Sequence, residues 1–349
     1  MHKPKTGRLI IHVGDHKLES TELQTALATQ RVSLVGQSLY YPGNSDHTSL
    51  YHQWKQKDAS TLNTLSRGIQ NVSADATILS GEWLEDAPAR FLKSVLDSHL
   101  AATCEDYKII TYVRPHAARF IATRVEQIKS GFHPEETLDQ FFERSLANKR
   151  FFYAPRYTDW RSTFNDAFAV RPLIETQLKG GSIVTDFMTT VADGQPFEVA
   201  ESATTDPKLN LRDLMVLKLV HRRTKSLDRA DHIGLGRSIA RHMSALGNFE
   251  SEPLRIHKSL AEAIAKAYRE DAQAMDSLLF GGKKVLEAEL DRAIDTALPQ
   301  PQSLRPADHL SADERRTILA LADMVHEVSG NGKNWNVHFR KAHAAALAN

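Results

Sequence analysis

The sequence predicts an α/β protein with a doubly wound parallel sheet, followed by a helical C-terminal part. Three observations support this prediction. Several short runs rich in Ile, Val and Tyr are apolar throughout, as expected for strands that are buried on both faces of a parallel sheet. Helical patterns fall between several of these runs, which is typical of strand–helix–strand units. Beyond about residue 205 no further strand-like run follows.

The predicted strands and helices of the core alternate along the chain. Helical patterns cover residues 86–102 and 115–131, among others. In the second of these helices, Pro115 suits the first turn and Gly131 suits a C-terminal cap. The predicted strands cover residues 8–14, 32–41, 76–82, 107–114 and 167–173.

The C-terminal part carries helical periodicity in three long stretches. Ser311 and Glu314 have the spacing of a capping box at the start of the last one. Residues 297–310 contain three prolines and form the clearest linker. We expect a single domain over the whole chain, with an α/β core over 1–205 and a helical part over 206–349.

Composition excludes several classes of protein. The chain has 349 residues, and its 44 Lys and Arg nearly balance its 43 Asp and Glu, so no bulk charge attracts nucleic acid or an anionic membrane. Cys104 is the single cysteine, which excludes an internal disulfide and a cysteine-based metal cluster. No apolar stretch approaches the ~18–20 residues that a membrane span requires. We therefore expect a cytoplasmic protein without a membrane span, and the oligomeric state stays open.

The turn after the first predicted strand has the layout of an anion site. It reads "GDHKLEST" and leads into a helix, whose first backbone N–H groups and positive dipole end attract anions. Lys17 would add a charge, and Ser20 and Thr21 would add hydroxyl donors. The second glycine of a Walker loop is missing, which disfavours an ATPase or GTPase. Taken alone, this motif is better explained as an ordinary turn with a solvated lysine.

The fourth predicted strand ends in Arg114 and leads into a helix. The carboxyl ends of neighbouring strands in an open α/β sheet face one crevice, so Arg114 would reach the same ligand as Lys17. Its planar guanidinium suits a second phosphate. The alternative is an arginine that pairs with a nearby carboxylate.

Six segments, taken in order, resemble the bacterial sulfotransferase-like family. These proteins are related to the enzymes that use 3′-phosphoadenosine-5′-phosphosulfate (PAPS). The first segment, "HVGDHKLESTELQ", is similar to the family's His-x-Gly-x-His-Lys-Thr-Gly-Thr/Ser-Thr turn and the Leu-Gln helix after it. The resemblance covers most of the chain, and the ordered set carries it rather than any one segment. The other segments are "YYPG" with His47, "ILSGEWL", "YVRPHAARFIATRVEQIKSG", "YTDWRSTFNDAFAVRPL" and "EDAQAMDSLLFGG".

The resemblance implies a P-loop or sulfotransferase type of sheet and a PAPS-dependent transferase. PAPS would be the co-substrate and would give its sulfuryl group to a hydroxyl, with a carbohydrate as the expected acceptor class. No metal is implied. Arg114 matches the arginine that binds the 3′-phosphate in the family. The residues that match the family's loop for binding the 5′-phosphosulfate are Gly14, His16, Lys17, Ser20 and Thr21.

Sulfuryl transfer resembles phosphoryl transfer and proceeds by in-line displacement. Lys17 and the helix N-terminus would stabilise charge on the departing nucleotide oxygen. A base must also accept the proton of the acceptor hydroxyl. Glu82, at the end of the third predicted strand, is slightly preferred over His47 for this role. Structural alternatives are that Glu82 caps the next helix and that His47 is an ordinary loop residue.

Two positions depart from the family pattern. Glu19 replaces a loop glycine, and a glutamate facing the ligand would oppose its charge by roughly 1–4 kcal/mol. Ala122 replaces a serine that binds the 3′-phosphate, a loss of about 1.5–3 kcal/mol. Thr123 is adjacent but lies about 100° around the helix.

These departures support a second hypothesis, a catalytically inactive homologue that binds a glycan or a partner protein. A third hypothesis, a kinase-like enzyme, is disfavoured by the missing Walker signature. His12 and His16 have a metal-like spacing, but no acidic partner is evident, so we expect no metal.

Overall fold

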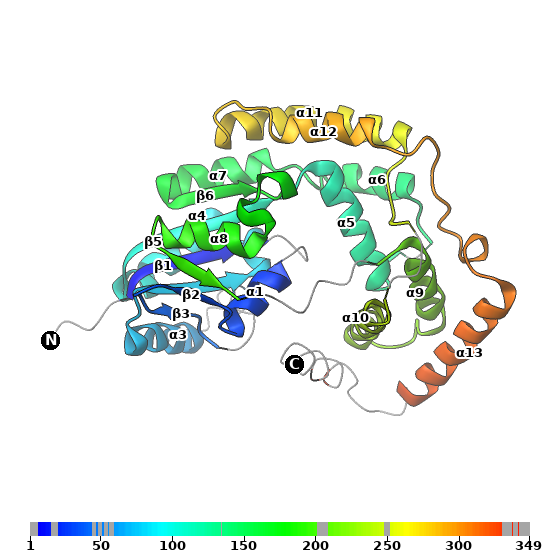
Figure 1. Cartoon of the computed structure of the whole chain (residues 1–349), viewed down its shortest axis with the longest axis horizontal. Helices are drawn as coiled ribbons and strands as arrows, with labels where there is room; N and C mark the ends of the chain where they lie inside the picture. Colours follow the sequence, from blue (N-terminus) through cyan, green and yellow to red (C-terminus); the bar gives the residue numbers. More distant parts are fainter. Residues whose placement is uncertain are drawn as a thin grey trace. The chain divides into compact units, whose positions relative to one another are not determined.

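The computed structural model divides the chain into two compact units, each described here by itself (Figure 1). The first unit comprises Met1–Pro115, Phe152–Thr205 and Asp271–Leu286. The second unit comprises His116–Phe151, Asp206–Glu270 and Glu287–Asn349. The structure describes residues 6–14, 20–43, 47, 51, 55, 59–133, 135–200, 209–247, 252–329, 337 and 341.

A five-stranded parallel sheet forms the centre of the first unit. The three central strands are buried on both faces at their middles, which confirms the prediction of a sheet covered on both sides; the residues there that are 0% exposed include Leu9, Ile10, Ile11, Ile78, Leu79, Ile109 and Ile110. Among the described residues, the α-helices that lie wholly within this unit are α1 (Ser20–Ala28), α3 (Ala59–Val72), α4 (Ala89–Val95), α7 (Ala154–Phe164) and α8 (Ile183–Ala192). The strand order is β3 (Leu39–Tyr40), β4 (Ala76–Gly81), β1 (Thr6–Val13), β5 (Cys104–Val113) and β6 (Phe168–Pro172).

Helices cover both faces of this sheet. On one face, Ile10 of β1 and Ile110 of β5 pack with Leu23 of α1 and Phe187 of α8. Side chains alternate along a strand, so Val13 of β1 points to the opposite face, where α7 lies. The doubly wound α/β class that the sequence predicts is therefore confirmed.

Two local predictions for the core are wrong. Residues 32–41 form two strands rather than one, because Gly36 turns the chain at a φ of 75°. Strand β2 (Val32–Leu34) pairs antiparallel with β7 (Phe197–Val199) in a separate small sheet, while β3 joins the large one. The helix expected over 86–102 is regular only in α4, and a π-helical turn (Leu96–Leu100) and a 3₁₀ turn (Ala101–Thr103) follow it.

The second unit is helical. Past β7, no β-strand occurs among the described residues, which confirms the predicted helical C-terminal part. Three helices of this unit share a small apolar core around Val220, Leu235 and Ala322. The helices are α5 (His116–Lys129), α6 (Leu138–Ala147), α9 (Leu211–Arg223), α10 (Arg229–Ala245), α11 (Lys258–Leu279, which continues into the first unit), α12 (Leu286–Asp295) and α13 (Ala312–Ser329).

Both predicted helix ends in this unit are confirmed. Gly131 has a φ of 76°, and the N–H of Phe132 donates to the carbonyl of Gln127, as in a Schellman cap. The N–H of Ser311 donates to the Glu314 carboxylate (2.8 Å), and the N–H of Glu314 donates to the Ser311 hydroxyl (3.2 Å).

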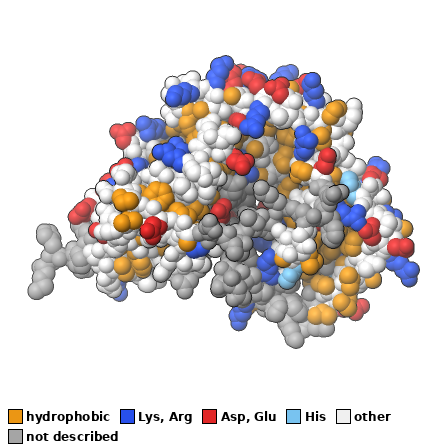
Figure 2. All heavy atoms as spheres, viewed as in Figure 1, with side chains coloured by type: hydrophobic (Ala, Val, Ile, Leu, Met, Phe, Trp, Pro, Cys, Tyr) orange, Lys and Arg blue, Asp and Glu red, His pale blue; other side chains and the backbone are white. Residues whose placement is uncertain are grey.

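The division into units does not follow the predicted boundary at residue 205. Helices α5 and α6 belong to the second unit, whereas residues Asp271–Leu286 belong to the first. Among the described residues, no helix has the length and apolar composition needed to cross a bilayer. On the face drawn in Figure 2, side chains of both charges are interspersed, in keeping with the balanced composition.

Candidate anion site at the ends of β1 and β5

The sheet of the first unit has a topological switch point between β1 and β5. From β1 the chain continues to β3 and β4 on one side, and from β5 it continues to β6 on the other. The two strands are adjacent and parallel, with Val13 opposite Thr111. Open α/β sheets bind ligands in the crevice at such a point, beyond the carboxyl ends of the strands.

The predicted phosphate loop connects β1 to α1 at this edge. Gly14 follows β1 directly and is buried, and its N–H donates to the carbonyl of Gly81 (3.2 Å). Helix α1 begins at Ser20, as the predicted turn requires. His16 and Lys17 lie outside the described residues, as does Glu19. Ser20 and Thr21 are described as helical backbone, without their side chains.

Arg114 directly follows β5 at the same edge and is half-buried. Its carbonyl accepts a hydrogen bond from the Tyr153 hydroxyl (2.9 Å). The backbone N–H groups of Tyr153 and Ala154 donate in turn to the carboxylate of Asp271, each at 2.9 Å. Asp271, from the "EDAQAMDSLLFGG" segment, thus anchors the start of α7 and, through Tyr153, the end of β5.

The second predicted 3′-phosphate position lies on α5, in the second unit. The Thr123 hydroxyl donates to the Arg119 carbonyl one turn earlier (2.8 Å), so its hydrogen is already engaged within the helix. Ala122 precedes it and has no polar side-chain atom to offer.

The two candidate bases have different surroundings. His47 is buried, its Nδ1 accepts from the Ser80 N–H (3.0 Å), and its Nε2 donates to the Pro42 carbonyl (2.7 Å). Glu82 is half-buried and begins the 3₁₀ turn Glu82–Asp86 that follows β4. Because Gly81 pairs with Val13, Glu82 lies at the same edge of the sheet as Gly14.

A buried polar cluster joins β1, β4 and α1. The Ser80 hydroxyl is 2.8 Å from His12 Nδ1 and accepts a hydrogen bond from the Gln24 amide (3.2 Å). Burial lowers the pKa of His12 to about 4, so its imidazole is neutral at physiological pH. The cluster ties β1, β4 and α1 together on either side of the loop. Sequence reasoning missed it, although polar residues within two apolar strands are the signal that indicates it.

A second polar network joins β5 and β6 to helix α8. Asp186 of α8 is fully buried and accepts two hydrogen bonds from Arg171 of β6 (3.0 and 2.6 Å) and one from the Tyr112 hydroxyl (2.8 Å). Burial alone would raise the pKa of Asp186, but the hydrogen bonds from Arg171 and its neighbours outweigh it and lower that pKa. Arg171, from the "YTDWRSTFNDAFAVRPL" segment, is thus engaged in an ion pair with Asp186.

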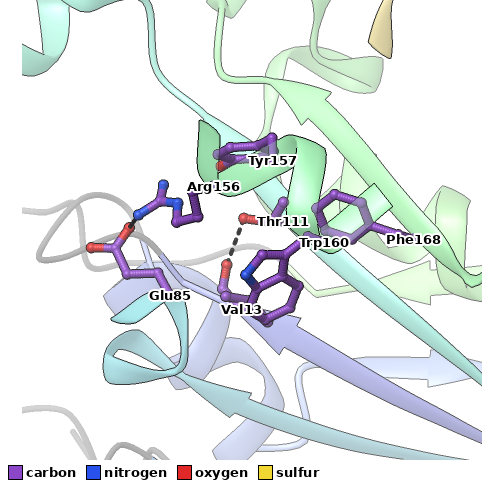
Figure 3. Close-up of a pocket in the computed structure, with 7 residues that line it drawn as sticks. All are labelled: Val13, Glu85, Thr111, Arg156, Tyr157, Trp160 and Phe168. Atoms are coloured by element: carbon purple, nitrogen blue, oxygen red, sulfur yellow. Dashed lines mark hydrogen bonds and ion pairs between the residues drawn. The ribbon is translucent and has the colours of Figure 1, made fainter. Parts of the chain in front are cut away.

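A small pocket opens on the α7 face of the sheet (Figure 3). Among the residues that line it, Arg156 donates to Glu85 (3.1 Å) and the Thr111 hydroxyl donates to the Val13 carbonyl (2.9 Å). Its volume of about 10 Å³ holds at most one water, so this pocket is too small for a nucleotide. Sequence reasoning did not single out Glu85 or Arg156. The lining residues are Val13, Glu85, Thr111, Arg156, Tyr157, Trp160 and Phe168.

Comparisons with known proteins add no assignment. No protein-family model matches the chain, and searches of curated proteins and of solved structures found no similar protein. Within the described part of the chain, no three His, Cys, Asp or Glu side chains are grouped as metal ligands.

Proposed function

We propose that the chain binds PAPS at the carboxyl ends of β1 and β5 and transfers its sulfuryl group to a hydroxyl of a carbohydrate. One observation carries this proposal. Gly14 and Arg114 follow adjacent parallel strands at the switch point of the sheet. Each is the first residue of a predicted phosphate-binding segment. Ligands of open α/β sheets bind at that point. The acceptor class rests on the family resemblance alone.

In the proposed reaction, the acceptor oxygen forms a bond to sulfur while the bond from sulfur to the nucleotide oxygen breaks. The nucleotide leaves as 3′-phosphoadenosine-5′-phosphate with the bonding electron pair. Lys17 and the first N–H groups of α1 stabilise the charge on that leaving oxygen. Arg114 holds the 3′-phosphate, which fixes the donor for in-line attack.

The base proposed for the acceptor proton is Glu82. His47 would have to give up its hydrogen bond from the Ser80 N–H before Nδ1 could accept a proton. Glu82 carries a carboxylate at the edge of the sheet that Gly14 shares. A Glu82→Gln variant is therefore expected to bind nucleotide normally and to lose transfer.

A silent homologue that binds a glycan or a partner protein is the second candidate function. Glu19 would weaken nucleotide binding at the predicted 5′-phosphosulfate site, and Ala122 would weaken it at the predicted 3′-phosphate site. The engaged hydroxyl of Thr123 supports this alternative further, because a phosphate oxygen requires a donor there.

Titration calorimetry with 3′-phosphoadenosine-5′-phosphate distinguishes the two candidates. The sulfotransferase proposal predicts binding by the wild type and at least ~10-fold weaker binding by Lys17→Ala, because one charge-assisted bond is lost. Binding by Glu19→Gly but not by the wild type would support the silent homologue. If neither protein binds, the proposed site is wrong.

A further inference from the structure

Helix α13 has two apolar faces, and one of them is packed within the second unit. Ile318, Ala322 and Val325 lie on this face and contact the small core that also contains residues of α9 and α10. Ala322 is 2% exposed, and Ile318 and Val325 are partly buried against the same core. The packing of this face accounts for the position of α13 within the second unit.

The other face of α13 is exposed. Leu321, Met324 and Val328 are 53%, 55% and 49% exposed, and Figure 2 shows hydrophobic side chains gathered over this helix at the lower right. With Thr317 these residues are spaced by four, three and four, the seam pattern of a two-helix coiled coil. An open groove runs along this face, lined by Asp313, Arg316, Thr317, Ala320, Leu321 and Met324.

The charges beside this seam are complementary to those of a second copy. Arg316 and Glu327 are both exposed and lie about three turns apart on the same side of the seam. If two α13 helices pair antiparallel about a two-fold axis, Arg316 of each copy faces Glu327 of the other. In a parallel pair, the two-fold axis would instead place Arg316 and Glu327 of the two copies on opposite sides of the interface, so these charges would not meet.

We propose that the seam of α13 (Thr317, Leu321, Met324 and Val328) binds the same seam of a second copy of this chain, antiparallel and about a two-fold axis. Such an interface is self-complementary and closed, so it gives a dimer rather than a filament. A single helix pair lies at the small end of specific interfaces, below about 1,200 Å². The association is therefore expected to be in the micromolar range.

Sedimentation velocity over ~1 to ~100 µM protein tests the proposal. The wild type is expected to shift from monomer to dimer. Arg316→Glu and Glu327→Arg should each weaken the dimer by roughly tenfold, because each sets two like-charge pairs across the axis. An equimolar mixture of the two variants should dimerise again, since every facing pair is then of opposite sign. Lys266→Glu, an exposed change on α11, is the matched control and should behave as wild type.

Several outcomes would overturn the proposal. One is a wild type that stays monomeric over the whole range, and another is a mixture that stays as weak as its components. A chain ending at residue 329 that dimerises when the full chain does not would show that the remaining residues cover the seam. Leu321→Glu provides a second check and should abolish the dimer without loss of helical circular dichroism.

Discussion

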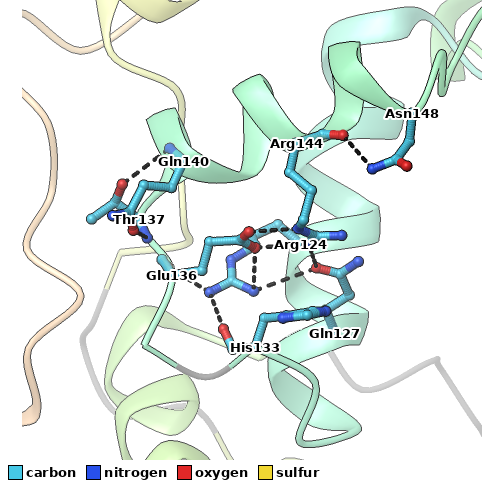
Figure 4. A network of polar contacts seen from close by, with 8 residues as sticks. All are labelled: Arg124, Gln127, His133, Glu136, Thr137, Gln140, Arg144 and Asn148. Carbon is cyan, nitrogen blue, oxygen red and sulfur yellow. Dashed lines mark hydrogen bonds and ion pairs between the residues drawn. The ribbon is translucent and has the colours of Figure 1, made fainter.

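Arg124 of α5 illustrates how a single buried charge is held in this fold. None of its side chain is exposed, and its guanidinium donates to the carbonyls of His133 (2.9 Å) and Glu136 (2.6 Å), as Figure 4 shows. Burial lowers the pKa of Arg124 to about 10, which still leaves it charged at neutral pH. The Glu136 carboxylate lies 3.6 Å away and also receives two hydrogen bonds from Arg144. The charge of Glu136 therefore compensates a guanidinium that has no access to water.

Two neighbouring glutamates test this compensation. Glu136→Ala should lower the free energy of unfolding by about 2–4 kcal/mol, because Arg124 would remain buried without a counter-charge. Glu135 also pairs with an arginine, Arg222, but its side chain is 58% exposed. Glu135→Ala should therefore cost less than ~1 kcal/mol. Urea denaturation of both variants measures the difference, and equal losses would refute this account of Arg124.

At the scale of an element, Gly131 controls how closely α5 approaches its neighbours in the second unit. Its φ of 76° ends the helix, and a Cβ at this position would lie 2.7 Å from His221 Nδ1 and from His232 Cε1. The two imidazoles are themselves in contact, with Nδ1 of His221 2.6 Å from Nε2 of His232. A side chain at residue 131 would therefore strain the backbone and also push this histidine pair apart.

A pair of glycine variants separates strain from crowding. Gly131→Ala should cost about 2–4 kcal/mol, the sum of a positive φ and of overpacking. Gly247 has a φ of 87° with no atom within 4 Å of the added Cβ, so Gly247→Ala should cost only about 1 kcal/mol. Thermal or urea unfolding of the two variants measures both. Equal losses of unfolding free energy would mean that His221 and His232 can move aside without a measurable cost.

The elements also explain what the sequence could predict. Continuous apolar runs and helix caps are local signals, so the central strands and the caps at Gly131 and Ser311 were predictable. Residues 32–41 are divided into two strands by the turn at Gly36, and the high β-propensity of the residues around it hides that turn in the sequence. Strand β7 is too short to show any periodicity. The His12 cluster and the Asp271 anchor join residues far apart in sequence, and no local pattern encodes such contacts.

For the whole molecule, buried neutral histidines link stability to pH. Burial lowers the pKa of His12 in the first unit and, together with the charge of His232, that of His221 in the second, each to about 4. An unfolded histidine titrates near ~6.5. Between these values the unfolded chain binds more protons, so stability is present above pH ~6.5 and is lost as the pH falls towards 4.

The expected slope is up to about 1.4 kcal/mol per pH unit for each such histidine. His12→Asn keeps a polar atom near Ser80 but removes the titrating ring. It should be less stable at pH 7 and should lose less stability between pH 6.5 and 4.5. The exposed His242→Asn is the control, and its slope should match that of the wild type. A His12→Asn slope equal to that of the wild type would contradict this assignment.

We propose that Arg114, at the end of β5, holds the 3′-phosphate of the nucleotide. A calorimetric cycle tests it by titrating wild type and Arg114→Ala with 3′-phosphoadenosine-5′-phosphate and with adenosine 5′-phosphate, and Arg90→Ala serves as an exposed control. We expect removal of the 3′-phosphate to weaken nucleotide binding by the wild type about 10- to 100-fold and to leave binding by Arg114→Ala nearly unchanged. The same loss in both proteins would contradict it.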